Sequence, residues 1–324
     1  MRKALDLNDY LDGFKRKDRS ILARAITLIE SRNPDHQKLA QELLQSLLPL
    51  TGNSKRIGIS GTPGVGKSTF IEAFGSLLTS NQLSVAVLAV DPTSKVSGGS
   101  ILGDKTRMNQ LSLDPLAFIR PSPSGDSLGG VARRTRESIL LCEAFGFDFV
   151  LVETVGVGQS ETAVSQMVDL FIMLLQPGSG DDLQGIKRGI LEMVDMVVVT
   201  KDDGENSTVI KKAKHDYEQA LQILRHEGMI PQVLSCSAFT KKGLPEIKQV
   251  LESFFINQKK QIQVKREKQG LEWMWQLIHE ALVDEFHSKV SDQTIDEVKA
   301  KVLSAKLTPP QAAELLLKKT KLEF

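Results

Sequence analysis

The chain has 324 residues, and it has few of the sequence features that disulfide-rich, zinc-binding or membrane-spanning proteins require. Its two cysteines, Cys142 and Cys236, show no CxxC spacing, so we expect buried thiols in a reducing compartment and no disulfide framework. The five histidines show no metal-ligand spacing with cysteine or carboxylate partners, which argues against a zinc site. No segment approaches the roughly 18 consecutive apolar residues of a membrane span, so we expect no membrane partner.

The chain also has no large excess of positive or negative charge. Lysine and arginine number 41 against 40 aspartates and glutamates, a formal net charge of +1 that gives no electrostatic reason to expect nucleic acid. The basic stretch at residues 257–269 contains no aromatic residue, so we interpret it as a solvated helix face. The N-terminus has three aspartates among its first dozen residues and no apolar run typical of a signal peptide. We therefore expect a cytoplasmic protein.

The hydrophobic pattern divides the chain into three parts. From Asp18 to Leu50 apolar residues recur at intervals of three and four, which predicts two amphipathic helices within an N-terminal helical region, residues 1–50. Residues 51–255 alternate helical or glycine-rich segments with short apolar runs such as "IGIS", "VAVLAV", "FVLVE", "LFIMLLQ" and "MVVVT". That alternation predicts an α/β fold with a mainly parallel sheet flanked by helices. Residues 256–324 predict a C-terminal helical region.

The clearest motif directly follows the first of these runs. "SGTPGVGKST" places G-x-x-x-x-G-K-[ST] at Gly61 to Ser68, between a predicted strand and a predicted helix, which is the context of a P-loop. In such a loop backbone N–H groups bind phosphate oxygens, Lys67 neutralises phosphate charge and the Ser68 hydroxyl binds Mg²⁺. The predicted nucleotide-binding residues here are Gly61, Thr62, Pro63, Gly64, Val65, Gly66, Lys67, Ser68 and Thr69.

Carboxylates follow two further strands. Asp91 ends "VAVLAV" and Glu153 ends "FVLV", at the sheet edge where α/β folds hold ligands. Between them "GGSILGDKTRM" carries Asp104 and Arg107, and we interpret it as a loop that approaches Mg²⁺ and phosphate, with an ordinary surface loop as the alternative. The predicted metal ligands are Ser68, Asp91, Asp104 and Glu153.

The segment Glu153-Thr154-Val155-Gly156 has the form acid-x-x-Gly, in which the glycine N–H senses a γ-phosphate. We therefore predict Gly156 as a nucleotide-binding residue. The next residue is Val157, so no glutamine occupies the water-positioning place of small GTPases, and intrinsic hydrolysis should be slow. Gln159 is a lesser candidate for positioning water.

The stretch "VVVTKDDGEN" is similar to the N-K-x-D motif that reads guanine. Asp203 is placed to accept two N–H groups from the base, a pairing that adenine cannot reproduce, and Lys201 to lie along the base plane. Thr200 stands where asparagine is usual, which we expect to lower affinity without changing the base selected. A second guanine element, "LSCSAFTKKGL", places the Ala238 N–H near the base carbonyl; the predicted residues there are Ser237, Ala238 and Phe239.

Together "SGTPGVGKST", "AVDPTS", "GGSILGDKTRM", "VETVGVGQSE" and "QPGSGDDLQGIKRGI" resemble the methylmalonyl-CoA mutase-associated GTPase family (MeaB, also called ArgK) over nearly the whole chain. The resemblance implies a SIMIBI-class G protein that binds GTP, GDP and Mg²⁺ and forms a homodimer through C-terminal helices. It also implies a chaperone for an adenosylcobalamin-dependent mutase. By the same resemblance, residues 97–107, 155–161 and 177–188 are similar to three switches.

Catalysis by such a protein needs a cation that acts on the developing phosphate charge. We hypothesise that mutase docking brings Lys187 or Arg107 to that position, in the manner of an arginine finger. The predicted catalytic residues are Lys67, Asp104, Arg107, Glu153 and Lys187. Two other functions stay open at this point, a P-loop kinase, which the ArgK name implies, and an ATP-driven loader, which a weakened guanine site would permit.

Overall fold

The computed structural model describes residues 5–90, 108–121, 128–154, 160–177, 188–204, 207–224 and 230–319. The chain divides into two compact units, Met1–Ile262 and Gln263–Phe324. In the described parts of both units, every helix is too short or too polar to cross a membrane.

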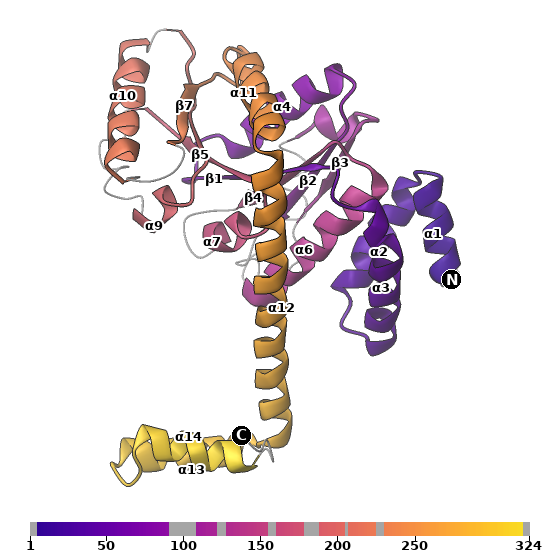
Figure 1. Cartoon of the computed structure of the whole chain (residues 1–324), viewed down its shortest axis with the longest axis vertical. Helices are drawn as coiled ribbons and strands as arrows, with labels where there is room; N and C mark the ends of the chain where they lie inside the picture. The colour runs from indigo at the N-terminus through magenta and orange to yellow at the C-terminus, as the bar shows by residue number, and fades with distance from the viewer. Residues whose placement is uncertain are drawn as a thin grey trace. The chain divides into compact units, whose positions relative to one another are not determined.

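The first unit is built on a seven-stranded sheet (Figure 1). All pairings are parallel, and the strand order is β3-β2-β4-β1-β5-β6-β7. The strands are β1 (Lys55–Gly61), β2 (Val85–Val90), β3 (Ala117–Arg120), β4 (Phe149–Thr154), β5 (Leu170–Leu175), β6 (Met196–Val199) and β7 (Gln232–Ser235). Because the strands are parallel, their carboxyl ends meet at one edge, and this confirms the predicted α/β fold.

Helices cover both faces of the sheet, which explains why the strands read as continuous apolar runs. One face packs against α1 (Leu7–Lys15), α2 (Arg19–Glu30), α3 (Pro34–Leu47), α6 (Leu128–Phe145), α7 (Ser160–Ser165), α9 (Arg188–Leu191) and α10 (Ser207–Leu224). The other face packs against α4 (Lys67–Ser80), α11 (Leu244–Asn257) and the 3₁₀ turn η2 (Leu111–Leu113). A second 3₁₀ turn, η1 (Leu48–Leu50), follows α3.

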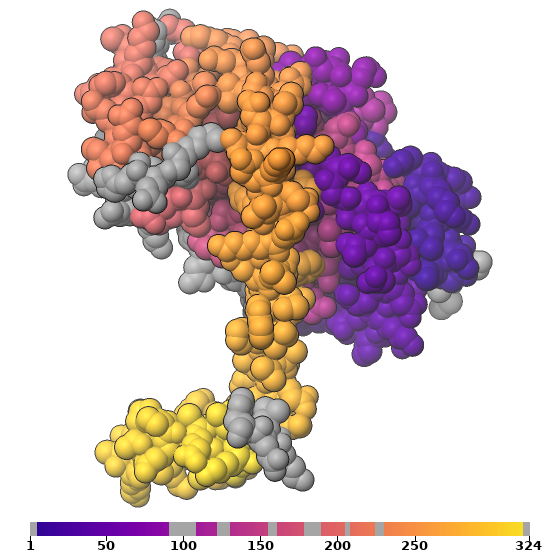
Figure 2. All heavy atoms as spheres, viewed as in Figure 1, coloured from indigo at the N-terminus to yellow at the C-terminus, as the bar shows by residue number. Residues whose placement is uncertain are grey.

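The N-terminal helices α2 and α3 confirm the two helices predicted between Asp18 and Leu50, but α1 was not predicted. Its signal is a capping box, in which the Asp6 carboxylate accepts the Asp9 N–H at 2.8 Å and the Asp9 carboxylate accepts the Asp6 N–H at 3.2 Å. Tyr10 and Phe14, one turn apart, form the buried face of α1. In the space-filling view the N-terminal helices lie directly against the rest of the first unit (Figure 2).

Polar contacts anchor this helical layer to the sheet. The Arg19 guanidinium donates to the Ala117 carbonyl at 2.7 Å, and the Lys17 ammonium donates to the Phe145 carbonyl at the end of α6. An ion pair joins Arg120 of β3 to Glu30 of α2. The contacts reach strand β3 and helix α6, so the N-terminal helices are an integral part of the first unit.

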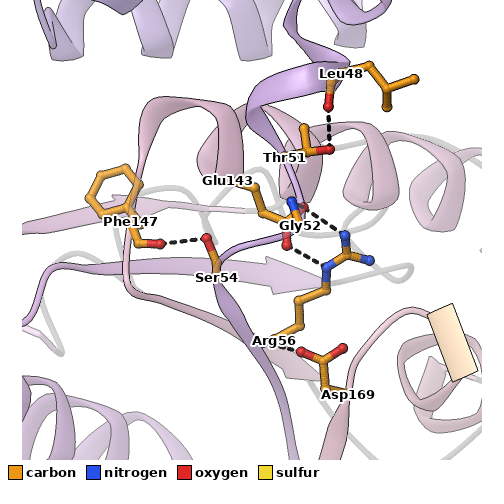
Figure 3. Close-up of polar contacts among 8 residues, drawn as sticks. All are labelled: Leu48, Thr51, Gly52, Ser54, Arg56, Glu143, Phe147 and Asp169. Carbon is orange, nitrogen blue, oxygen red and sulfur yellow. Dashed lines mark hydrogen bonds and ion pairs between the residues drawn. The ribbon is translucent and has the colours of Figure 1, made fainter. Parts of the chain in front are cut away.

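At the amino edge of the sheet, Arg56 lies at the centre of a partly buried polar network (Figure 3). Its guanidinium donates to both carboxylate oxygens of Glu143 at 2.7 Å, and its backbone N–H donates to Asp169 at 2.8 Å. The Glu143 carboxylate also accepts the Gly52 N–H at 3.1 Å. The network therefore joins the chain entering β1 to α6 and to the start of β5.

The second unit consists of helices. It contains the part of α12 (Lys259–Lys289) after Ile262, then α13 (Asp292–Leu303) and α14 (Pro309–Lys319). The Ser291 side chain caps α13 by accepting the Thr294 N–H at 3.3 Å, and α14 begins at Pro309. Val298 of α13 and Ala312 of α14 are buried. These helices confirm the prediction that the C-terminal part of the chain is helical.

Candidate functional site

The loop between β1 and α4 has the backbone that the glycines of its motif predict. Gly64 and Gly66 have φ values of +82° and +100°, in the left-handed region that glycine adopts without steric cost. At Gly61 an added Cβ would lie 2.5 Å from the Leu174 carbonyl oxygen of the neighbouring strand β5. Glycine at that position therefore lets the loop turn closely over the sheet edge, with α4 beginning immediately after it at Lys67.

Lys67 is a buried cation inside this loop. Its ammonium donates to the Gly61 carbonyl at 2.6 Å and to the Thr62 carbonyl at 3.2 Å. Burial lowers the pKa of Lys67, while the carboxylates of Glu153 and Glu161 act in the opposite direction. The loop thus holds a desolvated positive charge at the N-terminus of a helix, which is a favourable place for an anion.

Two oxygen ligands lie beside this cation. The Ser68 hydroxyl donates a hydrogen bond of 3.2 Å to the Glu153 carboxylate, which comes from β4 next to β1 in the sheet. Glu153 is buried, and no sulfur or imidazole is part of this pair. A hydroxyl and a carboxylate are hard oxygen donors, so this pair suits Mg²⁺.

A cavity of about 110 Å³ lies further along the same edge, beyond β5. It is lined by Val65, Gly66, Thr69, Phe70, Thr200, Lys201, Asp203, Cys236, Ala238 and Phe239. Residues from the P-loop and from the segments after β6 and β7 therefore meet around one space. Most of these lining residues were predicted from the sequence to bind nucleotide. Phe70 and Cys236 were not, because their sequence context is that of core residues.

Thr200 joins the two halves of the site. Its hydroxyl lies 2.9 Å from the Val65 carbonyl in the P-loop and 3.2 Å from the Leu175 carbonyl at the end of β5. The side chain is buried, so both contacts are shielded from water. Threonine thus supplies a donor to the P-loop at the place where asparagine is usual in the motif.

Lys201 and Asp203 face the cavity from the loop after β6. Lys201 has a φ of +61°, and its ammonium donates to the Gln176 side-chain oxygen at 2.7 Å. Asp203 is an exposed residue, and its carboxylate accepts a hydrogen bond from the buried Ser237 hydroxyl. The Ser237 oxygen in turn accepts the Thr240 N–H at 3.0 Å. The carboxylate is therefore held by the loop after β7.

The structure brings together the P-loop residues, Glu153, Thr200, Lys201, Asp203, Ser237, Ala238 and Phe239. The other predicted site residues lie outside the described residues, and they are Asp91, Asp104, Arg107, Gly156 and Lys187. Sequence reasoning did not find the contact of Gln176 with Lys201, because a strand-end glutamine has no distinctive pattern. It also passed over Glu161, whose carboxylate influences the pKa of Lys67.

The parallel sheet, the glycine loop between β1 and α4, and the buried lysine define a P-loop nucleoside triphosphatase. The family model described as "Methylmalonyl Co-A mutase-associated GTPase MeaB" matches residues 22–291. The chain belongs to this family, and it is a P-loop GTPase.

Relatives and solved structures agree with this assignment. The chain is 48% identical over 319 residues to GTPase ArgK of Escherichia coli, with 96% of each chain covered. It is 47% identical over 322 residues to the mitochondrial methylmalonic aciduria type A homolog of Mus musculus, covering 94% of this chain and 77% of that one. A crystal structure of a LAO/AO transport system kinase superposes with a TM-score of 0.79 at 40% identity, over 98% of this chain and 99% of that one.

Proposed function

We propose that this GTPase is a cytoplasmic chaperone of an adenosylcobalamin-dependent methylmalonyl-CoA mutase, and that it loads, protects or reactivates the mutase cofactor in response to its bound nucleotide. The observation that supports it most is the gathering of a phosphate loop, a Ser68–Glu153 pair and the Asp203 cavity at one sheet edge. Family membership supports the choice of partner, because the relatives include methylmalonic aciduria type A homologs.

In this proposal Lys67 and the backbone of residues 61–69 bind the phosphates of GTP and GDP. Ser68 and Glu153 would hold Mg²⁺, together with Asp91 and Asp104, and the ion would neutralise charge on the phosphates. The backbone N–H of Gly156 would sense the γ-phosphate. Lys187 or Arg107 would supply the cation that speeds hydrolysis when the mutase docks.

The base would occupy the cavity between β6 and β7. Asp203 would accept the two N–H groups of guanine, and the Ala238 N–H would donate to its carbonyl oxygen. The stem of Lys201 and the ring of Phe239 would cover the base, while Ser237 holds Asp203 and Thr200 holds the P-loop. Adenine offers a single amine and no carbonyl at this edge, so the proposed pocket selects GTP over ATP.

We also propose that the family function uses a homodimer formed through the C-terminal helical region, residues 256–324. Apolar side chains of α12 are exposed at intervals of three, four and seven residues, namely Val264, Leu271, Met274, Trp275, Ile278 and Leu282. Such spacing places them along one stripe of the helix, which is the pattern of a helix that packs against another. Residues 1–50 and 51–255 would form the N-terminal layer and the GTPase domain.

Two measurements test the function. Purified protein loaded with GTP, GDP or ADP is used to capture partners from cytosol, and we expect a cobalamin-dependent mutase with the GTP-loaded form. Equal capture with ADP would contradict the proposal. Phosphate release is then measured with and without that mutase, for the wild type and for Lys187→Ala and Arg107→Ala. We expect stimulation that at least one substitution removes. Stimulation that survives both substitutions would contradict the assigned cations.

A further inference from the structure

Asp202 lies between Lys201 and Asp203 in the sequence, but unlike these two residues of the proposed base site it is buried. Only 5% of the Asp202 side chain is exposed, whereas Lys201 and Asp203 on either side are exposed. Its Oδ1 atom accepts a hydrogen bond of 2.8 Å from the Lys242 ammonium, and its Oδ2 atom accepts one of 3.0 Å from the Ser235 hydroxyl. Asp202 therefore faces away from the cavity, and both of its carboxylate oxygens are bonded to the β7 side of the site.

These contacts join the loop after β6 to the loop after β7. The backbone adds one more link between the loops, from the Asp202 N–H to the Cys236 carbonyl at 3.1 Å, and a second bond within the loop after β7, from the Ser237 N–H to the Lys242 carbonyl at 3.0 Å. The second bond closes residues 237–242 into a compact loop. Lys242 is thus held at the base of the loop that carries Ala238, and its ammonium reaches across to the loop that carries Asp203.

Gly243 shows how tightly this loop is closed. Its φ is +77°, and an added Cβ would lie 2.1 Å from the Ser235 carbonyl oxygen. A side chain cannot be accommodated there without moving the backbone. The backbone directly after Lys242 therefore packs closely against the end of β7.

We propose that Asp202 and Lys242 are positioning residues for base recognition, whose ion pair sets the separation between the Asp203 carboxylate and the Ala238 backbone N–H. The inference rests on the proposed guanine pocket. The edge of a purine is rigid, so an acceptor on one loop and a donor on another read it together only when the two loops are held at a fixed spacing. The P-loop contacts phosphate independently of this pair.

The charge state of Asp202 agrees with such a role. Burial raises the pKa of Asp202, but hydrogen bonds from Lys242 and Ser235 outweigh it and hold the pKa below its ordinary value. The carboxylate is thus ionised at neutral pH. Removing the Lys242 cation would leave a buried carboxylate with the Ser235 hydroxyl as its remaining side-chain donor among the described contacts, which favours movement of one loop away from the other.

The test compares Lys242→Met and Asp202→Asn with Lys242→Arg, which retains a cation. Lys248→Met is the matched control, because Lys248 forms a 2.8 Å ion pair with Glu252 on the adjacent helix α11, away from the cavity lining. Dissociation constants for GDP and ADP are measured by calorimetry, and melting temperatures are measured without nucleotide. We expect Lys242→Met to reduce the preference for GDP over ADP about tenfold, with Lys242→Arg restoring most of it and Lys248→Met keeping the wild-type ratio.

A double variant gives the second measurement. If the two residues act as a pair, Lys242→Met combined with Asp202→Asn should lose no more selectivity than Asp202→Asn alone. Equal losses of GDP and ADP affinity, or a lower melting temperature with unchanged selectivity, would overturn the positioning role. A wild-type protein that binds ADP as tightly as GDP would instead overturn the proposed guanine pocket itself, so the two failures are distinguishable.

Discussion

The hydroxyl of Thr200 donates a hydrogen bond to the backbone carbonyl oxygen of Val65, 2.9 Å away, and so ties the loop after β6 to the loop between β1 and α4. Replacing Thr200 with valine keeps the shape and removes the donor. Because a buried hydrogen bond contributes about 1 kcal/mol, we expect Thr200→Val to raise the dissociation constant for GDP about fivefold. Thr200→Ser keeps the hydroxyl and is the control. Stopped-flow measurement of GDP release checks this, and an unchanged release rate in Thr200→Val would contradict it.

Asp203 is expected to determine which purine binds. An asparagine at this position presents an N–H donor, which suits the carbonyl that xanthine carries in place of the guanine amine. We expect Asp203→Asn to weaken GDP binding at least a hundredfold and to strengthen binding of xanthosine diphosphate. Competition of each nucleotide against a fluorescent analogue measures the affinities for GDP and for xanthosine diphosphate. A variant that loses both nucleotides equally would show that Asp203 supports the fold of the pocket instead.

Phe239 is 90% exposed although it lines the cavity, which is unusual for an aromatic side chain. Stacking of a base on an aromatic ring is worth about 1 to 3 kcal/mol and depends little on the base. We therefore expect Phe239→Ala to weaken GDP and inosine diphosphate by the same factor, about tenfold, and Phe239→Tyr to have little effect. Calorimetry with the two nucleotides distinguishes this from a loss of selectivity.

The buried pair of Arg56 and Glu143 is expected to matter for stability and not for nucleotide binding. Arg56 has 14% of its side chain exposed and Glu143 none, so Arg56→Met leaves the Glu143 carboxylate buried without the Arg56 cation. We expect Arg56→Met to lower the free energy of unfolding by about 3 kcal/mol. Urea unfolding measures it, and Lys15→Met, which breaks an exposed pair with Asp12, should leave the midpoint unchanged. Equal midpoints in both variants would contradict the prediction.

The two thiols should be inert in the folded protein. Burial, followed by the nearby carboxylates of Asp202 and Asp203, raises the pKa of Cys236 to about 12, and burial raises the pKa of Cys142 as well. At pH 8 we expect no reaction with a thiol reagent until the chain unfolds, and then two thiols. Above the ordinary thiol pKa the unfolded chain releases protons that the folded chain retains, so stability should fall as pH rises towards 12. Rapid native labelling at pH 8 would contradict this.

Much of this fold follows from local pattern. A sheet buried on both faces must have continuous apolar strands, so "VAVLAV" and "FVLVE" identify β2 and β4, and Glu153, the first polar residue of β4, lies near the carboxyl end of its strand. The P-loop was predictable because its glycine positions are forced by backbone geometry, which leaves a fixed spacing in the sequence.

Contacts between distant segments were not predictable in the same way. The bonds of Lys201 with Gln176 and of Asp202 with Lys242 join residues that are far apart in sequence, and Gln176, Asp202 and Lys242 each read as ordinary surface groups. Helix α1 was missed for another reason. Its capping aspartates were interpreted as evidence against a signal peptide, and a helix of nine residues has only a short apolar pattern.

Under the proposed function, folding and ligand binding favour different residues at the position of Lys201. A left-handed backbone costs a residue with a Cβ about 1 kcal/mol, and glycine would relieve it. A glycine there would also remove the alkyl stem and the ammonium that lies 2.7 Å from Gln176. Selection for thermal stability alone would thus favour glycine at this position, whereas selection for the proposed nucleotide binding would favour lysine. Long passages of laboratory evolution without nucleotide should accumulate glycine or asparagine at this site before they alter the neighbouring strand.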